Sequence, residues 1–455
     1  MADRNRRSFI RDVALGSALA LGTMGAKGAS NGPVLPLTRR RDTRSYGPND
    51  QIQLAVIGAG GMGVVDVNTA LEIEGVKLVA ACDLYDGRLE DALGNENWNQ
   101  GDLFTTKDYR EVLAREDVDA VIVATPDHWH RRISIDAMEA GKPVYCEKPM
   151  IHHVEEGMEV VDTERRTGTI LHVGSQGMSS LGNEKAKELY EAGAIGELNY
   201  VEGFWARNSP GGAWQYGLPD DASEETVDWE TFLGETEHLP FDPVRFFRWR
   251  NYNAYGTGVT GDLFVHLFSS LHYIVSSEGP NRIMATGGLR YWKDGRDAPD
   301  VVLGMFDYPE AAGHPPFNLS LRVNFVDGTS GNTTLRLVGN EGSMDVGWND
   351  VTLHKNKVSD PLAVFQEEVD PRVERYGERR QMLPPADAVY RAEDNYWGAH
   401  VDHFINFFEG VRTGTPTREN STFGFRAAAP AVLCNKSLFE ERIVRWDPTS
   451  MRLAD

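Results

Sequence analysis

Short apolar runs and longer helical segments alternate over the first part of the chain. Residues 52–57, 76–82, 120–124 and 169–174 are compact runs rich in valine, isoleucine and alanine, which predict buried strands. Residues 154–166 show the spacing of a helix. Strands that alternate with helices are typical of a doubly wound parallel sheet. We therefore predict an N-terminal α/β domain of the Rossmann type over residues 51–176.

The second part of the chain has a different pattern. Runs typical of strands cluster there with few helices between them, at residues 197–205, 282–292, 300–308, 317–325, 333–338, 343–346 and 351–354. Such clustering predicts a largely antiparallel sheet. Helical patterns occur at residues 183–192, 395–412 and 422–439, and a polar stretch at 355–393 predicts surface loops. We expect a C-terminal α/β domain, residues 177–455, with a large, mostly antiparallel open sheet.

A glycine-rich turn joins the first predicted strand to a helix. The turn contains Gly58, Gly60, Gly61, Met62 and Gly63, which fit the pattern G-x-G-x-x-G. In this setting the first glycine makes the tight turn, the second admits a pyrophosphate to the backbone, and the third lets the helix pack on the strand. The pyrophosphate then meets the helix N-terminus. The loop predicts a dinucleotide site.

The identity of the dinucleotide depends on the end of the next strand. Asp83 stands there, about 20 residues beyond the last glycine, where a carboxylate meets the ribose 2′-hydroxyl of NAD. Arg88 follows nearby and is a residue type that can accept the 2′-phosphate of NADP. We predict NAD as the cofactor, with NADP as the alternative.

Two further strand ends carry residues suited to chemistry. Thr125 and Pro126 follow one strand, and Glu147 and Lys148 follow another, just before Pro149. A lysine at the carboxyl end of a strand in an open α/β sheet points into the crevice where ligands bind. There its ammonium group can hold a substrate hydroxyl or carbonyl beside a nicotinamide ring.

The histidines after Pro126 have two interpretations. His128 and His130 have a spacing that is common in zinc and iron sites, but no cysteine or carboxylate cluster follows at a ligand-like interval. We therefore expect no metal and place His130 in the wall of the cofactor pocket.

A third group of polar residues opens a predicted helix. Asp262 and His266 are four residues apart, which places both side chains on one helical face. A histidine with an ordinary pKa near 6.5 is suited to removing a hydroxyl proton as hydride leaves. The alternative is an acidic residue favoured by the helix dipole and a histidine buried in the core.

Together these motifs resemble the glucose–fructose oxidoreductase/inositol dehydrogenase/rhizopine catabolism (Gfo/Idh/MocA) family. The resemblance rests on the glycine loop, the Thr-Pro-x-x-x-His turn that ends at His130, the Glu-Lys-Pro sequence and the later Asp-x-x-x-His. It implies an NAD(P)-dependent enzyme that acts on sugars or cyclitols. In this family pattern Lys148 is catalytic, His266 is the general base and Asp262 is its partner. The family also implies a homodimer or homotetramer formed through the open sheet.

Aromatic and basic residues between the two predicted domains suggest a place for the substrate. Aromatic faces stack on sugar rings, and arginines bind hydroxyls or acidic sugars. The tentative substrate contacts are Trp205, Arg207, Arg248, Trp249 and Tyr255. Packing of loops onto the second domain is the competing interpretation.

The first thirty residues resemble a twin-arginine export signal. Arg6 and Arg7 precede a short apolar run that is too brief to anchor the chain in a bilayer. We expect residues 1–30 to be a signal peptide that engages the twin-arginine export machinery and residues 31–50 to be a linker or arm. The protein would then be periplasmic or secreted, without a membrane anchor. A net charge of −22 argues against nucleic acid as a partner, and three scattered cysteines imply no disulfide framework.

Export limits the possible mechanisms. Free NAD is scarce outside the cytoplasm, so an exported enzyme cannot exchange its cofactor after every turnover. We expect a tightly bound cofactor that one carbohydrate substrate reduces and another oxidises. An alternative is a redox-neutral glycosidase in which a sugar is transiently oxidised. A non-catalytic nucleotide-binding scaffold is a third possibility, disfavoured by the joint presence of Lys148, Asp262 and His266.

Overall fold

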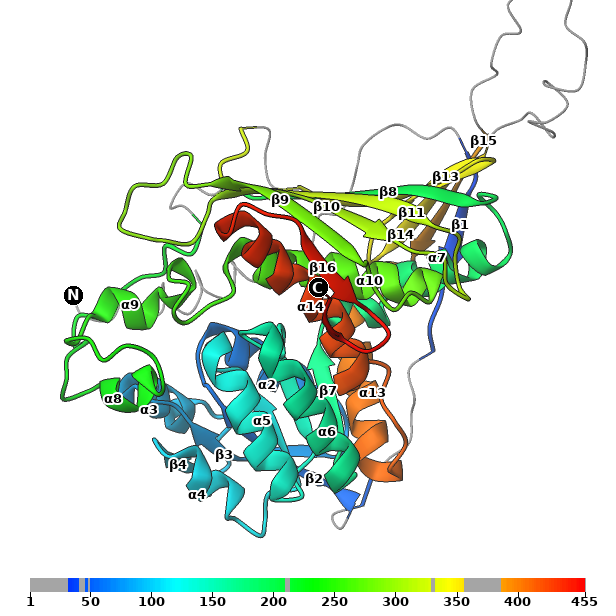
Figure 1. The fold of residues 1–455 in the computed structure, drawn as a ribbon. Helices are drawn as coiled ribbons and strands as arrows, with labels where there is room; N and C mark the ends of the chain where they lie inside the picture. The colour runs from blue at the N-terminus through cyan, green and yellow to red at the C-terminus, as the bar shows by residue number, and fades with distance from the viewer. Residues whose placement is uncertain are drawn as a thin grey trace, which may run out of the picture.

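Two sheets organise the chain, one parallel and one mostly antiparallel, with helices between and around them (Figure 1). A computed structural model describes residues 32–40, 46–47, 50–208, 213–328, 332–355 and 386–454. The predicted export signal, residues 1–30, lies outside these residues. Among the described helices, none is long and apolar enough to cross a membrane.

The parallel sheet is the predicted Rossmann sheet. Its order is β4 (Phe104–Thr106), β3 (Val76–Cys82), β2 (Ile52–Ile57), β5 (Ala120–Val123), β6 (Val144–Glu147) and β7 (Leu171–Gly174). All neighbouring pairs run parallel. The chain fills positions to one side of β2 first and then crosses to β5 on the other side. Ligands bind at such a switch point, outside the carboxyl ends of the strands.

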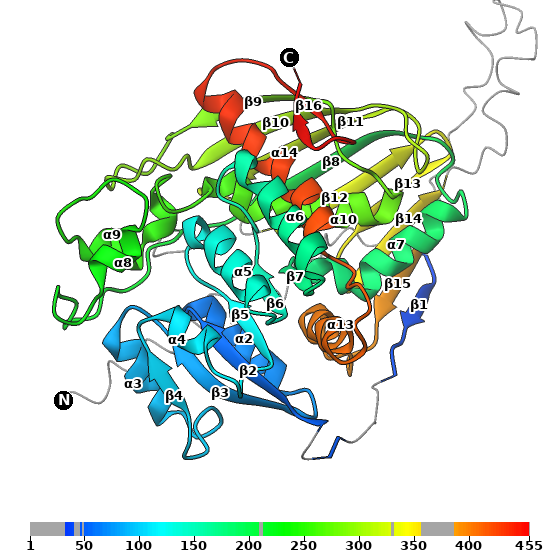
Figure 2. The ribbon, with the colours of Figure 1, turned by 60° about the horizontal axis from the view of Figure 1, so that its bottom comes forward.

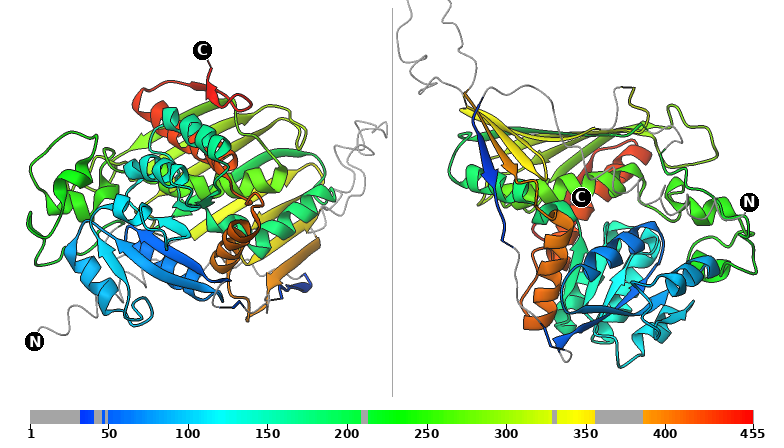
Figure 3. Two further views of the ribbon diagram at one scale, coloured as in Figure 1. Left: turned by 90° about the horizontal axis from the view of Figure 1, so that it is seen from below. Right: turned by 180° about the vertical axis from the view of Figure 1, so that it is seen from behind.

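Helices cover both faces of this sheet. They are α2 (Gly61–Leu71), α3 (Asp86–Gly94), α4 (Tyr109–Leu113), α5 (His130–Glu139) and α6 (Gly157–Thr167). The C-terminal part of the chain supplies a further one, α13 (Ala399–Thr413). Figures 2 and 3 show α13 between the parallel sheet and one edge of the large sheet.

Helix α13 completes the core of the nucleotide domain. Phe404, Phe407 and Phe408 are fully buried in one apolar cluster with Leu54 and Tyr145 of the parallel sheet. The rings of Tyr145 and Phe404 stack with centroids 4.1 Å apart. The expected boundary at residue 176 therefore divides the chain in sequence, but the packing crosses it.

The large sheet has eleven strands and is mostly antiparallel, as predicted. Its order is β1 (Val34–Leu37), β15 (Ala386–Ala392), β14 (Asp350–Lys355), β13 (Gly342–Val346), β12 (Asn332–Gly339), β8 (Leu198–Ala206), β11 (Phe317–Asn324), β10 (Val301–Tyr308), β9 (Arg282–Gly288), β16 (Val444–Asp447) and β17 (Arg452–Leu453). Two pairs, β8 with β11 and β1 with β15, are parallel.

One face of the large sheet carries helices and the other is open. Helices α7 (Leu181–Glu191), α10 (Val265–Val275) and α14 (Ser421–Phe439) lie on the face that looks toward the parallel sheet (Figure 1). In the described part of the chain, no helix lies on the opposite face (Figure 3). Two short helices, α8 (Trp229–Leu233) and α9 (Pro243–Phe247), belong to a separate lobe beside the nucleotide domain.

Two segments for which the sequence pattern predicted no strand, the arm and the polar loop, contain strands of the large sheet. β1 lies in the predicted arm, 31–50, and β15 lies in the predicted polar loop, 355–393. The prediction was wrong at these places because each strand is stabilised by pairing with a distant part of the chain. Val34 pairs with Val389, and Val389 in turn pairs with Thr352.

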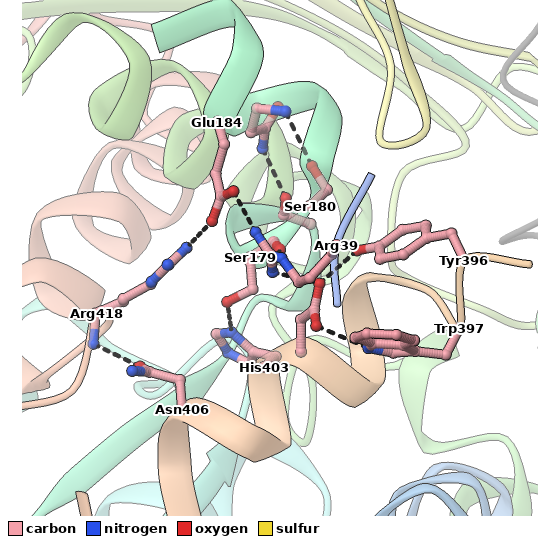
Figure 4. Close-up of polar contacts among 12 residues, drawn as sticks. Arg39, Ser179, Ser180, Glu184, Tyr396, Trp397, His403, Asn406 and Arg418 are labelled. Carbon is pink, nitrogen blue, oxygen red and sulfur yellow. Dashed lines mark hydrogen bonds and ion pairs between the residues drawn. The ribbon is translucent and has the colours of Figure 1, made fainter. Parts of the chain in front are cut away.

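Arg39 fastens the arm that carries β1 to the rest of the molecule. Its guanidinium group forms ion pairs with Asp402 of α13 and Glu184 of α7 (Figure 4). Asp402 also accepts hydrogen bonds from the Tyr396 hydroxyl, 2.7 Å away, and the Trp397 indole, 2.8 Å away. The arm is thus bound to α13, which packs on the parallel sheet, and to α7, which packs on the large sheet.

The role of α13 leads to a stability prediction. Phe407→Ala should lower the free energy of unfolding by about 3–5 kcal/mol, because it leaves a cavity in the core of the nucleotide domain. Urea denaturation measures this change. Phe439→Ala removes a ring of the same size that is 54% exposed, and it should change stability by no more than about 0.5 kcal/mol. Equal effects of the two substitutions would show that α13 does not complete this core.

Candidate cofactor and catalytic site

Of the glycines Gly58, Gly60 and Gly63, Gly60 is the one that leaves space beside its backbone. Gly58 has a φ of +97°, and a Cβ there would lie 2.6 Å from the carbonyl carbon of Ala124. A Cβ at Gly63 would lie 1.9 Å from the carbonyl oxygen of Gly58. At Gly60 the nearest atom would be the Arg88 guanidinium carbon, 3.4 Å away. The outer glycines are therefore required by the fold, whereas Gly60 leaves open the approach to the backbone.

The start of helix α2 is suited to an anion. Gly61 and Met62 are its first residues, and the N-cap residue Gly60 provides no side chain to bind the free N–H groups. Such groups, together with the helix dipole, favour a phosphate at this end. The residues present thus fit the pyrophosphate of a dinucleotide.

Asp83 lies at the carboxyl end of β3, where the ribose of a bound dinucleotide is expected. Its Oδ1 accepts hydrogen bonds from the backbone N–H of Tyr85, at 3.0 Å, and from Arg88, at 3.2 Å. Arg88 also lies over the rings of Phe246 and Phe247. The carboxylate is thus fixed in place, and Arg88 is already neutralised by it. A 2′-phosphate would meet this negative charge, so the arrangement favours NAD.

Two turns at the strand ends are tied together by His130. Its Nδ1 lies 2.7 Å from the carbonyl oxygen of Pro149, and its Nε2 lies 2.9 Å from that of Thr125. Both ring nitrogens are therefore used by the protein itself. His130 positions the Thr125-Pro126 turn and the Lys148-Pro149 bond, which is cis, and would act on a cofactor only through them.

Glu147 has a similar supporting position. It is buried, and its Oε1 accepts a hydrogen bond of 2.6 Å from the Gln176 amide. Burial and the nearby Asp66 raise the pKa of Glu147 to about 8. The side chain therefore carries a proton at neutral pH for most of the time and adds little negative charge to the site.

Lys148 forms the central contact of the site. Its Nζ lies 2.7 Å from Oδ1 of Asp262 and 3.0 Å from the Asp262 carbonyl oxygen. The two side chains are 11% and 12% exposed. Burial alone would raise the pKa of Asp262, but Lys148, Arg250 and Arg207 together bring it well below its usual value. The pair is therefore ionic, and it joins the end of β6 to the large-sheet domain.

The segment around Asp262 differs from the predicted helix. Residues Thr260–Phe264 form a π-helical turn, and α10 begins at Val265. Such turns widen a helix and occur often at functional sites. The Asp262 carboxylate binds Lys148 and Arg250 rather than the His266 ring. Asp262 was expected to be the partner of His266; its hydrogen bonds go to Lys148 and Arg250, and it acts on His266 through its charge.

His266 lies beside this ion pair with an unused ring nitrogen. Its Nδ1 is buried and has no hydrogen-bond partner among the described residues. Burial, aided by the nearby charge of Lys148, holds the pKa of His266 well below its usual value. The imidazole is therefore neutral at pH 7. A buried ring nitrogen without a partner is rare in proteins.

Two indole rings flank His266. Trp205 of β8 lies at a centroid distance of 5.5 Å, with the ring planes 30° apart. Trp348, in the turn between β13 and β14, lies 6.0 Å away on another side. Sequence reasoning identified Trp205 but missed Trp348. A tryptophan placed in a short turn among glycine, asparagine and aspartate was the signal that could have revealed it.

The five tentative substrate residues separate into two groups. Trp205 and Arg207 lie near His266 and Asp262: the Trp205 ring is 5.5 Å from that of His266, and the charge of Arg207 lowers the pKa of Asp262. Arg248 instead binds the Tyr216 carbonyl and the Gln215 side chain, and Trp249 packs on the guanidinium group of Arg250.

Tyr255, which we expected to contact the substrate, lies in a different environment. It is 1% exposed and belongs to the aromatic core of the α8–α9 lobe, next to Phe232. Its ring cannot reach a sugar without unpacking that core. The residue that takes its place near the site is Arg250, whose Nε lies 3.4 Å from Asp262.

The two histidines whose spacing is common in metal sites, His128 and His130, contact backbone carbonyl oxygens. His128 contacts the carbonyl oxygens of Tyr255 and Phe232, and His130 contacts two others. Within the described ranges, no three His, Cys, Asp or Glu side chains are grouped to hold a metal ion.

The geometry of the glycine loop leads to a binding prediction. Gly60→Ala should leave the fold intact but weaken NAD binding by roughly tenfold or more, because the new methyl group occupies the path of the pyrophosphate. Calorimetric titration measures the affinity, and thermal unfolding checks the fold. Gly94→Ala is the control, since no atom lies within 4 Å of the added methyl there. Unchanged affinity in Gly60→Ala would place the pyrophosphate elsewhere.

Comparison with known proteins agrees with this geometry. Residues 52–175 match the Gfo/Idh/MocA family described as an oxidoreductase family with an NAD-binding Rossmann fold. A protein of Shewanella baltica strain OS195, named "Glycosyl hydrolase family 109 protein", is 38% identical over 123 residues. That segment covers 26% of this chain and 27% of the relative, so the match spans about a quarter of each protein.

Solved structures resemble the whole fold. Levoglucosan dehydrogenase in complex with NADH and L-sorbose has a TM-score of 0.64 and 18% identity, over 88% of this chain and all of the other. GenD2 from gentamicin A biosynthesis in complex with NAD also has a TM-score of 0.64, with 16% identity over 90% of this chain. At such identities the likeness shows the fold alone. The sequence match over residues 52–175 shows an NAD-binding Rossmann domain and supports the resemblance of this chain to the Gfo/Idh/MocA oxidoreductases.

Proposed function

We propose that the protein is an NAD-dependent oxidoreductase that acts on a hydroxyl or carbonyl group of a sugar, a cyclitol or a glycoside. The observation that carries this proposal is the cluster of Lys148, Asp262 and His266. The cluster combines a fixed ammonium group with an unpartnered neutral imidazole, at the carboxyl end of β6. In an open α/β sheet this edge is where the ligand binds.

Each side chain has a distinct task in the proposed reaction. Lys148 donates a hydrogen bond to the reacting oxygen, while the Asp262 carboxylate holds the ammonium group in position. His266 accepts the hydroxyl proton, because its ring is neutral. When bound, NAD supplies the acceptor for the hydride that leaves the carbon. The C–H and O–H bonds break, and a carbonyl group forms.

The tryptophans beside His266 support a carbohydrate as substrate. Trp205 and Trp348 present flat apolar surfaces of the kind that pack against sugar rings. They also surround the imidazole and so reduce its contact with water. A hydrogen bond between Lys148 and the reacting oxygen is stronger in such an environment than in water.

A redox-neutral glycosidase is the second candidate. It is favoured by the name of the Shewanella baltica relative, which matches over the nucleotide domain. In that reaction the same residues would oxidise the sugar, a glycosidic bond would break, and the product would be reduced again. Release of an aglycone without net change in reduced nicotinamide absorbance would support it, whereas accumulation of reduced cofactor supports the oxidoreductase.

Substitution of the two catalytic residues tests the proposal. His266→Ala and Lys148→Ala should each lower kcat by roughly 10²–10⁴-fold, the usual contribution of a positioned acid–base group. Both variants should retain NAD, because the glycine loop and Asp83 bind it. Steady-state kinetics with a panel of sugars, glycosides and cyclitols, alongside calorimetry with NAD, gives both quantities.

The pH profile separates catalysis from a structural role. Because the pKa of His266 lies well below its usual value, the neutral base persists below pH 6.5. The value of kcat/KM for the wild type should then stay level through pH 6.5 and fall only at lower pH. Wild-type turnover in a folded His266→Ala variant would remove the general-base assignment.

We also propose that the protein is exported in folded form with NAD bound. The paired Arg6 and Arg7 before a short apolar run support this proposal. Replacing both by lysine should retain the protein in the cytoplasm, as fractionation and immunoblotting would show. Wild-type protein from the periplasm should contain extractable NAD. Unchanged export of the double variant would contradict the twin-arginine route, and protein without nucleotide would contradict export of the loaded form.

A further inference from the structure

Three cationic side chains surround the proposed reaction site. Lys148 lies 2.7 Å and the Arg250 Nε lies 3.4 Å from the same oxygen of Asp262. Arg207 is the third: it directly follows β8, two residues after Trp205, whose ring centroid lies 5.5 Å from that of His266, and its charge acts on both Asp262 and His266. A single carboxylate at the centre cannot neutralise three cations.

The other acidic groups nearby do not remove this excess. Glu147 has its pKa raised to about 8, and burial raises the pKa of Asp66 well above its usual value. Glu147 is therefore largely protonated at neutral pH, and the protonated form of Asp66 is favoured by its burial. Asp127 also faces Arg250, but its Oδ2 accepts two hydrogen bonds from Thr257. If Asp127 is counted as fully charged, the site still holds three positive side chains and only two negative ones, Asp262 and Asp127.

Arg207 is the cation without a partner. Among the described residues, its guanidinium group forms no hydrogen bond or ion pair, and its Nε is buried. A buried polar atom without a partner is costly, and the Nε of Arg207 is such an atom. A ligand that carries an oxyanion would satisfy it, because the planar guanidinium group binds such groups through paired hydrogen bonds.

The composition of the chain does not explain this cluster. The protein has 46 basic and 68 acidic residues, with a net charge of −22. A local excess of positive charge therefore runs against the average of the surface. This local positive charge would attract an anionic ligand, whereas the rest of the negatively charged protein would repel such a ligand.

We infer that the substrate carries a carboxylate group, as in a uronic acid or a glycoside of one, and that Arg207 and Arg250 bind this group while Lys148 and His266 engage the hydroxyl to be oxidised. The inference rests on the proposed function and specifies its substrate class. With Asp127 counted, the excess is about one positive charge, which a carboxylate matches; the phosphate arm of the experiment tests the dianion that would fit if Asp127 is left out.

The bound carboxylate would also assist the base. Arg207 helps to depress the pKa of His266, and a carboxylate that neutralises Arg207 reduces that effect. His266 would then accept the hydroxyl proton more readily when an acidic substrate is bound. A neutral sugar does not neutralise Arg207, so the pKa of His266 would stay depressed.

Binding to the NAD-loaded protein tests the inference independently of turnover. The probes are matched pairs: D-glucuronate with D-glucose, D-galacturonate with D-galactose, and their methyl glycosides, with glucose 6-phosphate as the phosphate arm. Calorimetry should show that at least one uronate binds roughly tenfold or more tightly than its neutral partner. This preference should weaken as salt is added.

Two variants locate the preference. Arg207→Gln should abolish most of the difference between a uronate and its neutral partner. Arg322→Gln removes the same charge from the exposed side of β11, where Arg322 lies over the Phe204 ring, and should leave the difference unchanged. An equal loss for acidic and neutral sugars in Arg207→Gln would mean that the residue supports the fold and would overturn the inference.

The remaining outcomes are also decisive. If no uronate binds more tightly than its neutral partner, or if glucose 6-phosphate binds best, the carboxylate assignment is wrong. Failure of the proposed function looks different: a uronate would bind in an Arg207-dependent manner, yet the enzyme would neither reduce NAD nor cleave a glycoside.

Discussion

The ion pair between Lys148 and Asp262 is the contact on which the site depends. Lys148 directly follows β6 of the parallel sheet, and Asp262 lies in the π-helical turn that precedes α10 on the large sheet. An ion pair that is nearly buried loses much of its hydration, and it is stable only when hydrogen bonds replace that loss. Here the Asp262 carbonyl and Arg250 provide them. The position of the ammonium group is therefore set by both sheets together.

The C-terminal helices maintain the relation between the sheets. On α13, the Nε2 of His400 lies 2.9 Å from Asp66 of α2, the helix that starts at the glycine loop. One turn further on, the Nε2 of His403 lies 2.7 Å from the Val173 carbonyl of β7. Arg39 adds the N-terminal arm to the same helix. The cofactor loop and the catalytic cluster are thus supported by one continuous set of buried contacts.

Local patterns predicted the nucleotide domain and the residues at its strand ends. The glycine loop, Asp83 and Lys148 lie at strand ends that short local patterns specify, so the sequence predicts their positions. The remaining features depend on contacts between distant segments. β1 exists because it pairs with β15, Trp348 enters the site because its turn crosses over Gly177, and Asp262 binds Lys148 because two domains meet. The i,i+4 spacing of Asp262 and His266 indicated a shared face, but the π-helical turn and the nearby lysine redirect the carboxylate.

A crystal structure of the protein with NAD bound tests the central claim most directly. The measurement is the position of the nicotinamide ring relative to Lys148 and His266. The account predicts that the pyrophosphate lies over Gly60 and that the ring lies beside both side chains, leaving room for a substrate oxygen at roughly 3–3.5 Å from the reacting groups. A nicotinamide ring that points away from Lys148, or a Lys148–Asp262 contact that breaks when NAD binds, would contradict it.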